Sequence, residues 1–215
     1  PVGEYDKRIV LLTRERGKIS AFAKGARRQN SPFMAAANPF VFGNFTLYEG
    51  RSSYNLNQVT VTHHFVELAA RQPGVYYGYY FLELADYFGR EGTDEKNMMN
   101  LLYLTVKALL NPELDDRLVR CIFELRTMME QGLMPELFRC VNCGEEIAGK
   151  ENLFFSQEAH GILDGDCLKK ASPGEARTAR RISQAALYTM QYIVSSPMTR
   201  LYSFTVTDEV LWELE

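Results

Sequence analysis

The sequence predicts a mixed α+β chain, in which an N-terminal OB-fold β-barrel is followed by an α-helical domain with an inserted zinc-ribbon-like segment. Three observations predict this order. Short runs of β-favouring residues open the chain, apolar side chains then recur at helical intervals, and a Cys-x-x-Cys motif appears late in the sequence. The predicted ranges are 1–62 for the barrel, 63–136 and 171–215 for the helical domain, and 137–170 for the insertion.

The N-terminal part begins with a predicted hairpin, because two β-rich runs flank a polar turn that contains Gly17. The four predicted strands are residues 8–13, 19–23, 41–48 and 55–61. Several short strands within about sixty residues are typical of a small barrel, and an OB-type barrel would hold nucleic acid on a curved face with aromatic and cationic side chains. The chain begins at Pro1 rather than Met, so we expect the first strand to be incomplete.

Four aromatic residues of these strands are candidate stacking platforms for bases: Phe22, Phe42, Phe45 and Tyr48. Aromatic residues at alternating positions of a strand are more often part of the core. Both interpretations stay open at this point.

Charge is distributed unevenly along the chain. Residues 1–62 carry nine Lys/Arg against four Asp/Glu, whereas residues 63–215 carry fifteen against twenty-three. A positive region on an acidic protein is the pattern expected of a module that binds a polyanion, although an ordinary solvated face has the same composition. The candidate phosphate contacts are Arg14, Arg16, Lys18, Lys24, Arg27, Arg28 and Arg51.

From His63 onward the apolar period becomes helical. Helices are predicted within 63–88, over 95–110 and over 114–131, and the last two are separated by Asn111-Pro112. Cys121 lies on an apolar helical stripe, where a buried thiol is expected rather than a metal ligand. The first of these helical segments contains more tyrosines than a core needs. They can form an aromatic groove or pack between helices. The cluster comprises Tyr76, Tyr77, Tyr79, Tyr80 and Tyr87.

The late cysteines predict a zinc site. Cys140 and Cys143 place two thiols on one tight turn, and Asp164 and Cys167 follow at the distance of a second such turn. The site would be structural, with one Zn²⁺ bound by three thiolates and a carboxylate. The alternatives are His160 as the fourth ligand, a degenerate ribbon that folds without metal, and a redox Cys-x-x-Cys, for which no thioredoxin-like strand precedes the motif.

After the cysteines, Ser172 to Glu175 is typical of a helix N-cap and first turn, and the helix is predicted to continue over 176–194. Three arginines fall early in this predicted helix and form a second candidate anion-binding site. They are Arg177, Arg180 and Arg181.

Catalytic motifs are scarce, and we expect no enzyme. The sequence contains no phosphate-binding P-loop, no Gly-x-Ser-x-Gly elbow, no His-Glu-x-x-His motif and no dinucleotide fingerprint. An enzyme would require His63 or His64 to meet a carboxylate in a pocket. No stretch is long and apolar enough to span a bilayer and no signal peptide is evident, so we expect a cytoplasmic protein without membrane partners.

Several segments together resemble the RecO family of bacterial recombination mediators. They are Gly3-Glu-Tyr-Asp-Lys-Arg-Ile-Val10, Leu12-Thr-Arg-Glu-Arg-Gly-Lys-Ile19, Lys24-Gly-Ala-Arg-Arg28, Phe45-Thr-Leu-Tyr48, and Cys140-x-x-Cys143 followed by Phe155-Ser156 and Gly161-Ile-Leu163. The resemblance covers essentially the whole chain in order. The family has a four-cysteine zinc site that some lineages have lost, and this sequence departs from it at Asp164.

The resemblance implies a non-enzymatic function in DNA repair and a cytoplasmic protein that is associated with the nucleoid. A RecO-like protein would bind single- and double-stranded DNA, anneal complementary strands and work with RecR to load RecA onto strands coated by the single-stranded-DNA-binding protein SSB. The acidic SSB tail would contact the helical domain, with Arg177, Arg180 and Arg181 as candidate partners of its carboxylates. The alternative is a zinc-ribbon protein-interaction adaptor without direct DNA binding, which the acidic C-terminal two-thirds favours.

Overall fold

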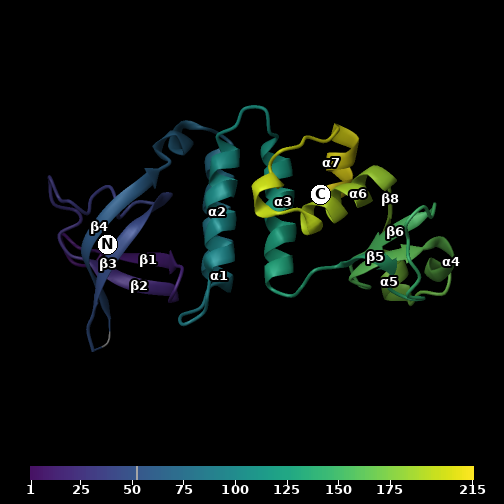
Figure 1. Ribbon diagram of the computed structural model, residues 1–215, viewed down its shortest axis with the longest axis horizontal. Coiled ribbons are helices and arrows are strands. Elements are labelled where there is room, and N and C mark those ends of the chain that lie inside the picture. The colour runs from purple at the N-terminus through teal and green to yellow at the C-terminus, as the bar shows by residue number, and fades with distance from the viewer. Residues whose placement is uncertain (52) are drawn as a thin grey trace. The chain divides into compact units, whose positions relative to one another are not determined.

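The structure, a computed structural model, describes residues 1–51 and 53–215. It is a mixed α+β chain that divides into two compact units, Pro1–Val119 and Arg120–Glu215 (Figure 1). The predicted fold class is therefore confirmed at the level of α+β.

The N-terminal unit contains a four-stranded sheet with the strand order β1-β2-β4-β3. The strands are β1 (Lys7–Thr13), β2 (Gly17–Ala23), β3 (Val41–Glu49) and β4 (Tyr54–His64). Strands β1 and β2 form the predicted hairpin, β3 and β4 form a second antiparallel pair, and a short parallel pairing of β2 with β4 joins the two pairs.

Side chains of β2 alternate strictly between the two faces of the sheet. Gly17, Ile19, Ala21 and Ala23 are buried, whereas the residues between them are half-buried. Ala23 packs with Ala26 and Leu56 in a small core. Half-buried side chains of β1, β3 and β4 and of the segment before β3 complete this core. The period-2 pattern that predicted the strand thus also gives its core face.

The prediction of a closed OB barrel is not met in the part of the chain that the structure describes. Strands β1 and β3 are the two edges of the sheet and do not pair with each other. Two register shifts bend the β3–β4 pair, after Phe42 and after Thr46. The result is an open, bent sheet rather than a closed barrel.

The predicted helices of the N-terminal unit are present. They are the short 3-10 helix η1 (Val66–Ala70), α1 (Gly74–Phe88), α2 (Lys96–Leu109) and α3 (Asp116–Glu130), which continues into the second unit. Helices α1 and α2 pack against each other and both contact β1. At Gly78 of α1, an added Cβ would lie 2.9–3.0 Å from side-chain atoms of Leu68 and Phe40, so this close approach requires glycine.

The C-terminal unit contains a second four-stranded sheet, with the order β5-β7-β6-β8. Its elements in chain order are β5 (Glu136–Cys140), β6 (Leu153–Ser156), β7 (Gly161–Asp164), α4 (Gly165–Leu168), α5 (Pro173–Thr178) and β8 (Ala179–Ile182). Helices α6 (Gln184–Ser195) and α7 (Asp208–Leu214) follow, with the short 3-10 helix η2 (Met198–Arg200) between them.

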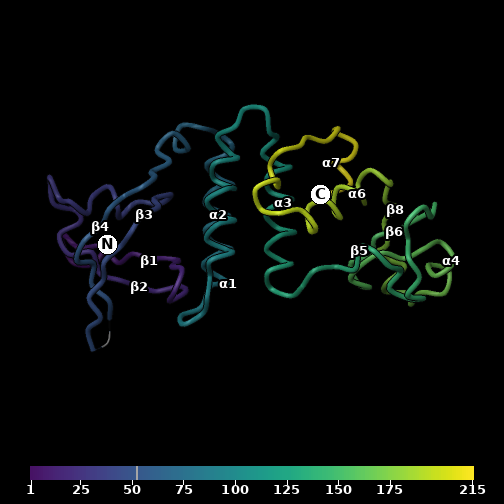
Figure 2. The backbone as a smooth tube through the Cα atoms, in the orientation of Figure 1, coloured from purple at the N-terminus to yellow at the C-terminus, as the bar shows by residue number. Residues whose placement is uncertain are grey.

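The prediction of one continuous helix over 176–194 is wrong. The capping box of Ser172 and Glu175 does start a helix, but α5 ends at Thr178. Residues 179–182 then pair with β6 as strand β8, and α6 begins after this strand (Figure 2). Ser183 caps α6, because its side chain accepts the backbone N–H of Ala186. The pairing with β6, which is distant in sequence, overrides the helical pattern.

Candidate metal centre and nucleic-acid interface

The Cys-x-x-Cys motif forms a tight turn at the end of β5. The backbone N–H of Gly144 donates to the carbonyl of Cys140 at 2.8 Å, and the N–H of Cys140 donates to the carbonyl of Glu145 at 2.8 Å. Gly144 has a φ of +74°, a conformation that favours glycine. This turn places the thiols of Cys140 and Cys143 on one side of the sheet.

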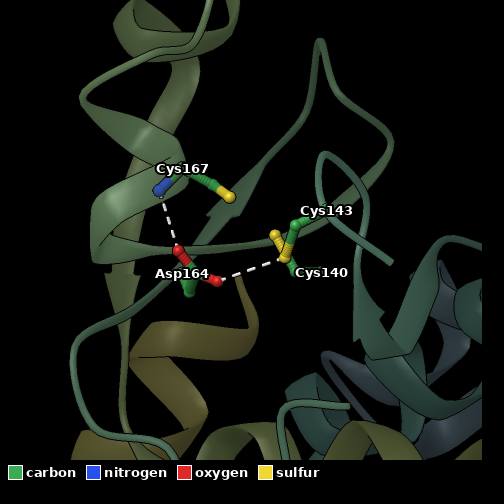
Figure 3. Close-up of side chains that lie close together, drawn as sticks. All are labelled: Cys140, Cys143, Asp164 and Cys167. Carbon is green, nitrogen blue, oxygen red and sulfur yellow. Dashed lines mark hydrogen bonds between the residues drawn. The ribbon is translucent and has the colours of Figure 1, made fainter. Parts of the chain in front are cut away.

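The second half of the site is formed where β7 runs into α4. Asp164 is the N-cap of α4, and its Oδ1 accepts the backbone N–H groups of Asp166 at 3.1 Å and of Cys167 at 2.8 Å. Its Oδ2 accepts the thiol of Cys143 at 3.5 Å, so the two carboxylate oxygens have different partners (Figure 3).

These four side chains form one cluster. One ligand atom each from Cys140, Cys143, Asp164 and Cys167 lies within 4.8 Å of the others, and all but Cys143 avoid exposure to solvent (Figure 3). A tetrahedral Zn²⁺ with usual bond lengths would set neighbouring sulfur and oxygen ligands roughly 3.6 Å apart. The distance of 3.5 Å between Cys143 Sγ and Asp164 Oδ2 fits this value. The cluster can therefore hold a metal ion.

The pKa values of the acidic groups in the cluster are shifted in different directions. The backbone N–H of Cys167 is the main cause that holds the pKa of Asp164 well below its ordinary value, so the carboxylate is ionised. Burial by itself would raise the pKa of Cys140. Backbone hydrogen bonds from the Cys-x-x-Cys turn and from Asp164 have the larger combined effect, so the pKa lies below its ordinary value. Burial, reinforced by the neighbouring thiols, raises the pKa of Cys167 to about 12. A bound cation would favour the ionised form of Cys167.

Lys150 is the cationic neighbour of the cluster. Its Nζ donates to Asp164 Oδ2 at 3.3 Å and to Glu145 Oε2 at 2.6 Å. Nothing in the spacing of the cysteines indicates this lysine, because it lies in the polar loop before β6 and only the fold brings it to the site. His160, the alternative ligand, lies in the turn between β6 and β7 and is not a member of the cluster.

The predicted phosphate contacts near the β1–β2 turn are partly engaged within the protein. Arg16 pairs with Glu49 at 3.3 Å, and Lys18 pairs with Asp86 of α1 at 3.4 Å. Among the described residues, no side-chain partner is found for Arg14 or Arg51, which are exposed. These two arginines are the most available cations at this end of the sheet.

The other predicted contacts follow β2. Arg27 donates to the backbone carbonyl of Glu4 at 3.2 Å, and the guanidinium of Arg28 lies 5.2 Å from the ring centre of Tyr5. Lys24 is exposed at the start of the same segment. Neither contact involves a carboxylate, so these contacts do not neutralise the positive charges of Arg27 and Arg28 at the surface.

The four candidate stacking residues have different environments. Phe42 makes edge contacts with Phe65 and Tyr103, and Phe45 packs against the small core, so these two rings have a structural environment. Tyr48 is 69% exposed, and Phe22 is half-buried on the outer face of β2. His63 contacts the hydroxyl of Tyr103 through Nε2 at 3.1 Å.

The three arginines of the C-terminal unit are exposed but do not share one helical face. Arg177 lies in α5, whereas Arg180 and Arg181 are consecutive residues of β8, where successive side chains point to opposite faces. Arg181 donates to Asn152 Oδ1 at 3.3 Å. The expectation of three arginines along one early helical turn is therefore corrected by the strand.

Comparisons with known proteins agree on one family. The family model described as "Recombination protein O N terminal" matches residues 1–65, and "Recombination protein O C terminal" matches residues 74–215. No helix in the described part of the chain has the length and apolar character needed to cross a membrane.

Curated relatives of high similarity are called DNA repair protein RecO. The protein from Alkaliphilus metalliredigens is 35% identical over 166 residues, which cover 74% of this chain and 68% of the relative. The protein from Symbiobacterium thermophilum is 31% identical over 213 residues, or 99% of this chain and 82% of the relative. The protein from Acetivibrio thermocellus is 28% identical over 212 residues, with 99% and 82% covered.

Proposed function

This chain belongs to the RecO family, and on that premise we propose that it binds single- and double-stranded DNA and anneals complementary strands. A function in DNA repair and recombination follows from the family itself. The observation that carries the finer proposal is the basic N-terminal sheet of an otherwise acidic chain, on which Arg14, Lys24 and Arg51 are exposed.

Annealing makes and breaks no covalent bond in the DNA backbone. It requires a surface that neutralises phosphates of two strands and leaves the bases able to pair. Exposed arginine and lysine side chains supply the neutralisation, and the counterions released from DNA make the affinity depend on salt. No general acid, base or nucleophile is needed, which is consistent with the scarcity of catalytic motifs.

We further propose that the chain works with RecR and the SSB tail to load RecA. An acidic tail would be recognised by exposed cations, for which Arg177, Arg180 and Arg181 stay the candidates in the C-terminal unit. Because Arg180 and Arg181 point to opposite faces of β8, only one of them can join Arg177 on a given surface. Single charge reversals therefore distinguish the two faces.

The cluster of Cys140, Cys143, Asp164 and Cys167 is proposed to hold one structural Zn²⁺. The ion would cross-link the turn after β5 to the corner between β7 and α4, as metal ions in structural sites with four protein ligands do. Metal analysis of the purified protein tests this: one zinc per chain that is lost in Cys140→Ser supports it. If the wild-type protein contains no metal and Cys140→Ser has the same melting temperature as the wild type, a degenerate ribbon that folds without metal is favoured.

Salt-dependent DNA binding tests the main proposal. Fluorescence polarisation with labelled single-stranded DNA is expected to show steep loss of affinity with salt, and Arg27→Glu with Arg28→Glu should weaken binding and flatten that slope. Arg117→Glu, which alters a half-buried arginine of the helical region, is the charge-matched control for the single reversal Arg27→Glu, because each changes the net charge by the same amount. Absence of binding at low salt would contradict the proposal.

One feature favours the adaptor as a second candidate. Tyr76, Glu83 and Tyr87 lie on one face of α1 at helical spacing, and the two tyrosines are 62% and 79% exposed. Exposed tyrosines of this kind are frequent in protein interfaces. Absence of salt-sensitive DNA binding by the wild-type protein, together with loss of binding to a protein partner in a double Tyr76→Ser, Tyr87→Ser variant, would favour the adaptor and assign this face to that partner.

A further inference from the structure

The outer face of the β1–β2 hairpin borders a cavity of about 420 Å³. The hairpin contributes Arg8, Ser20 and Phe22, and the segment that leads into β4 contributes Arg51 and Tyr54. This volume lies within the range of roughly 300–1,000 Å³ that is usual for sites of small ligands. The cavity is thus large enough for one building block of a polymer but not for a duplex.

Arg8 and Phe22 are held side by side in this cavity by strand pairing. They are direct partners in the register of β1 and β2, so their side chains share one face of the sheet. Arg8 Nε donates to Ser20 Oγ at 2.6 Å, which fixes the guanidinium and leaves its two terminal nitrogens for a ligand. Arg8 was not among the phosphate contacts expected from the sequence.

The charges around the cavity favour an anion. Among the described residues, no carboxylate pairs with Arg8 or Arg51. Of the two lining carboxylates, Glu49 pairs with Arg16 at 3.3 Å, and Glu91 accepts the hydroxyl of Tyr54, itself a lining residue, at 3.2 Å. Because Arg16 neutralises Glu49, the two lining arginines outnumber the one remaining lining carboxylate, that of Glu91. Planar guanidinium groups match the oxygens of a phosphate.

We propose that this cavity binds one nucleotide of a single strand, with its phosphate on Arg8 and Arg51 and its base against Phe22. The inference rests on the proposed DNA binding and adds a defined subsite to it. A base must be unpaired and unstacked to reach an aromatic ring in a cavity of this size, whereas a duplex presents only its backbone. The subsite therefore favours single strands over duplexes.

An abasic strand separates the role of the base from that of the phosphate. Affinities are measured at one salt concentration for a thymidine oligomer and for an abasic oligomer of equal length and charge. The wild-type protein is expected to bind the thymidine strand about tenfold more tightly, and Phe22→Leu should reduce this preference to about twofold or less. Arg8→Gln should weaken both strands alike and lower the salt slope by about one.

Two further variants serve as controls. Tyr48→Leu removes an exposed aromatic residue of the same sheet that does not line the cavity, and the base preference is expected to persist. Phe22→Tyr keeps an aromatic ring and should retain it as well, which guards against a folding defect in Phe22→Leu. The subsite is overturned if both strands bind in a salt-sensitive way without a base preference. It is also overturned if Tyr48→Leu, and not Phe22→Leu, abolishes the preference. In both cases the proposal of DNA binding stands. No binding of either strand overturns both proposals.

Discussion

Asp164 accepts the backbone N–H of Cys167 at 2.8 Å, although both residues also belong to the same candidate metal cluster. One carboxylate therefore caps the helix and belongs to the candidate metal cluster. Oδ1 holds the start of α4 and with it the position of Cys167, while Oδ2 faces the thiol of Cys143. As a metal ligand, this carboxylate would orient Cys167 in addition to supplying one donor atom.

A substitution series at Asp164 separates these two functions. Asp164→Asn keeps a side chain that caps helices well but removes the charged ligand, so we expect zinc affinity to fall at least about tenfold. Metal-free stability should fall as well, because the ion pair with Lys150 is lost while the helix cap is kept. Asp164→Ala should lose the cap in addition, at a cost of about 1 kcal/mol. Asp164→Cys should bind zinc more tightly than the wild type, because thiolate is the softer ligand.

Zinc titration with a chromogenic chelator and urea unfolding of the metal-free proteins measure the two effects. Equal zinc affinity of Asp164→Asn and the wild type would show that this carboxylate only caps α4.

Metal removal is expected to act locally. The cluster joins the β5 turn to the β7–α4 corner, so chelation of zinc should accelerate amide exchange in β5, β6 and β7 and leave the β1–β4 sheet unchanged. Hydrogen exchange followed by mass spectrometry, with and without a chelator, tests this. Equal acceleration of amide exchange in both sheets would contradict a local effect of the metal.

Arg126 is expected to contribute strongly to stability. It is 5% exposed, and its Nη1 donates to the carbonyls of Ile193, Val194 and Ser196 at the C-terminal end of α6, at 3.2–3.3 Å. Arg126→Met would leave these buried carbonyls without a charged donor and should cost about 2–4 kcal/mol in the free energy of unfolding.

Urea unfolding measures this cost. The matched control is Arg117→Met on the same helix, whose exposed ion pair with Asp115 should contribute less than about 1 kcal/mol. Similar costs for both variants would argue against the capping role of Arg126.

The buried thiol of Cys121 should make stability depend on alkaline pH. Burial is the main cause that raises its pKa from 9.0 to about 11. Below pH 9 both states hold the proton; between pH 9 and 11 only the unfolded state releases it, so stability falls as pH rises through this window. Relative to Cys121→Ala, the wild type should lose up to about 2–3 kcal/mol there.

Urea unfolding of both proteins at several pH values measures the difference, which cancels the titration of lysines and tyrosines common to both. Parallel pH profiles would show that Cys121 titrates alike in the folded and unfolded states.

Exposed and paired cations should differ in their effect on DNA binding. Lys24→Gln and Arg51→Gln are each expected to lower the slope of log affinity against log salt by about one, because each removes one available phosphate contact. Lys18→Gln should change the slope less, since Lys18 already pairs with Asp86. An equal change for all three would mean that Lys18 leaves Asp86 to contact DNA.

Features decided by near neighbours in sequence were predictable from the sequence alone. The strands of the β1–β2 hairpin follow from alternation and from Gly17, and the start of α5 follows from Ser172 and Glu175, whose side chains cap the helix within three residues. The Cys-x-x-Cys turn is equally local. The cluster of Cys140 and Cys143 with Asp164 and Cys167 was predicted correctly because their spacing is that of a known metal site.

Features decided by partners far along the chain required the tertiary structure. Residues 179–182 carry a helical pattern, but hydrogen bonds to β6 make them a strand. The pairing of Lys18 with Asp86, and that of Lys150 with Asp164, join segments that the sequence does not connect. The sequence determined which chemical groups this protein has and where its local turns and caps lie. The tertiary structure decided which charges are free to bind a ligand, because charges are neutralised by neighbours in space.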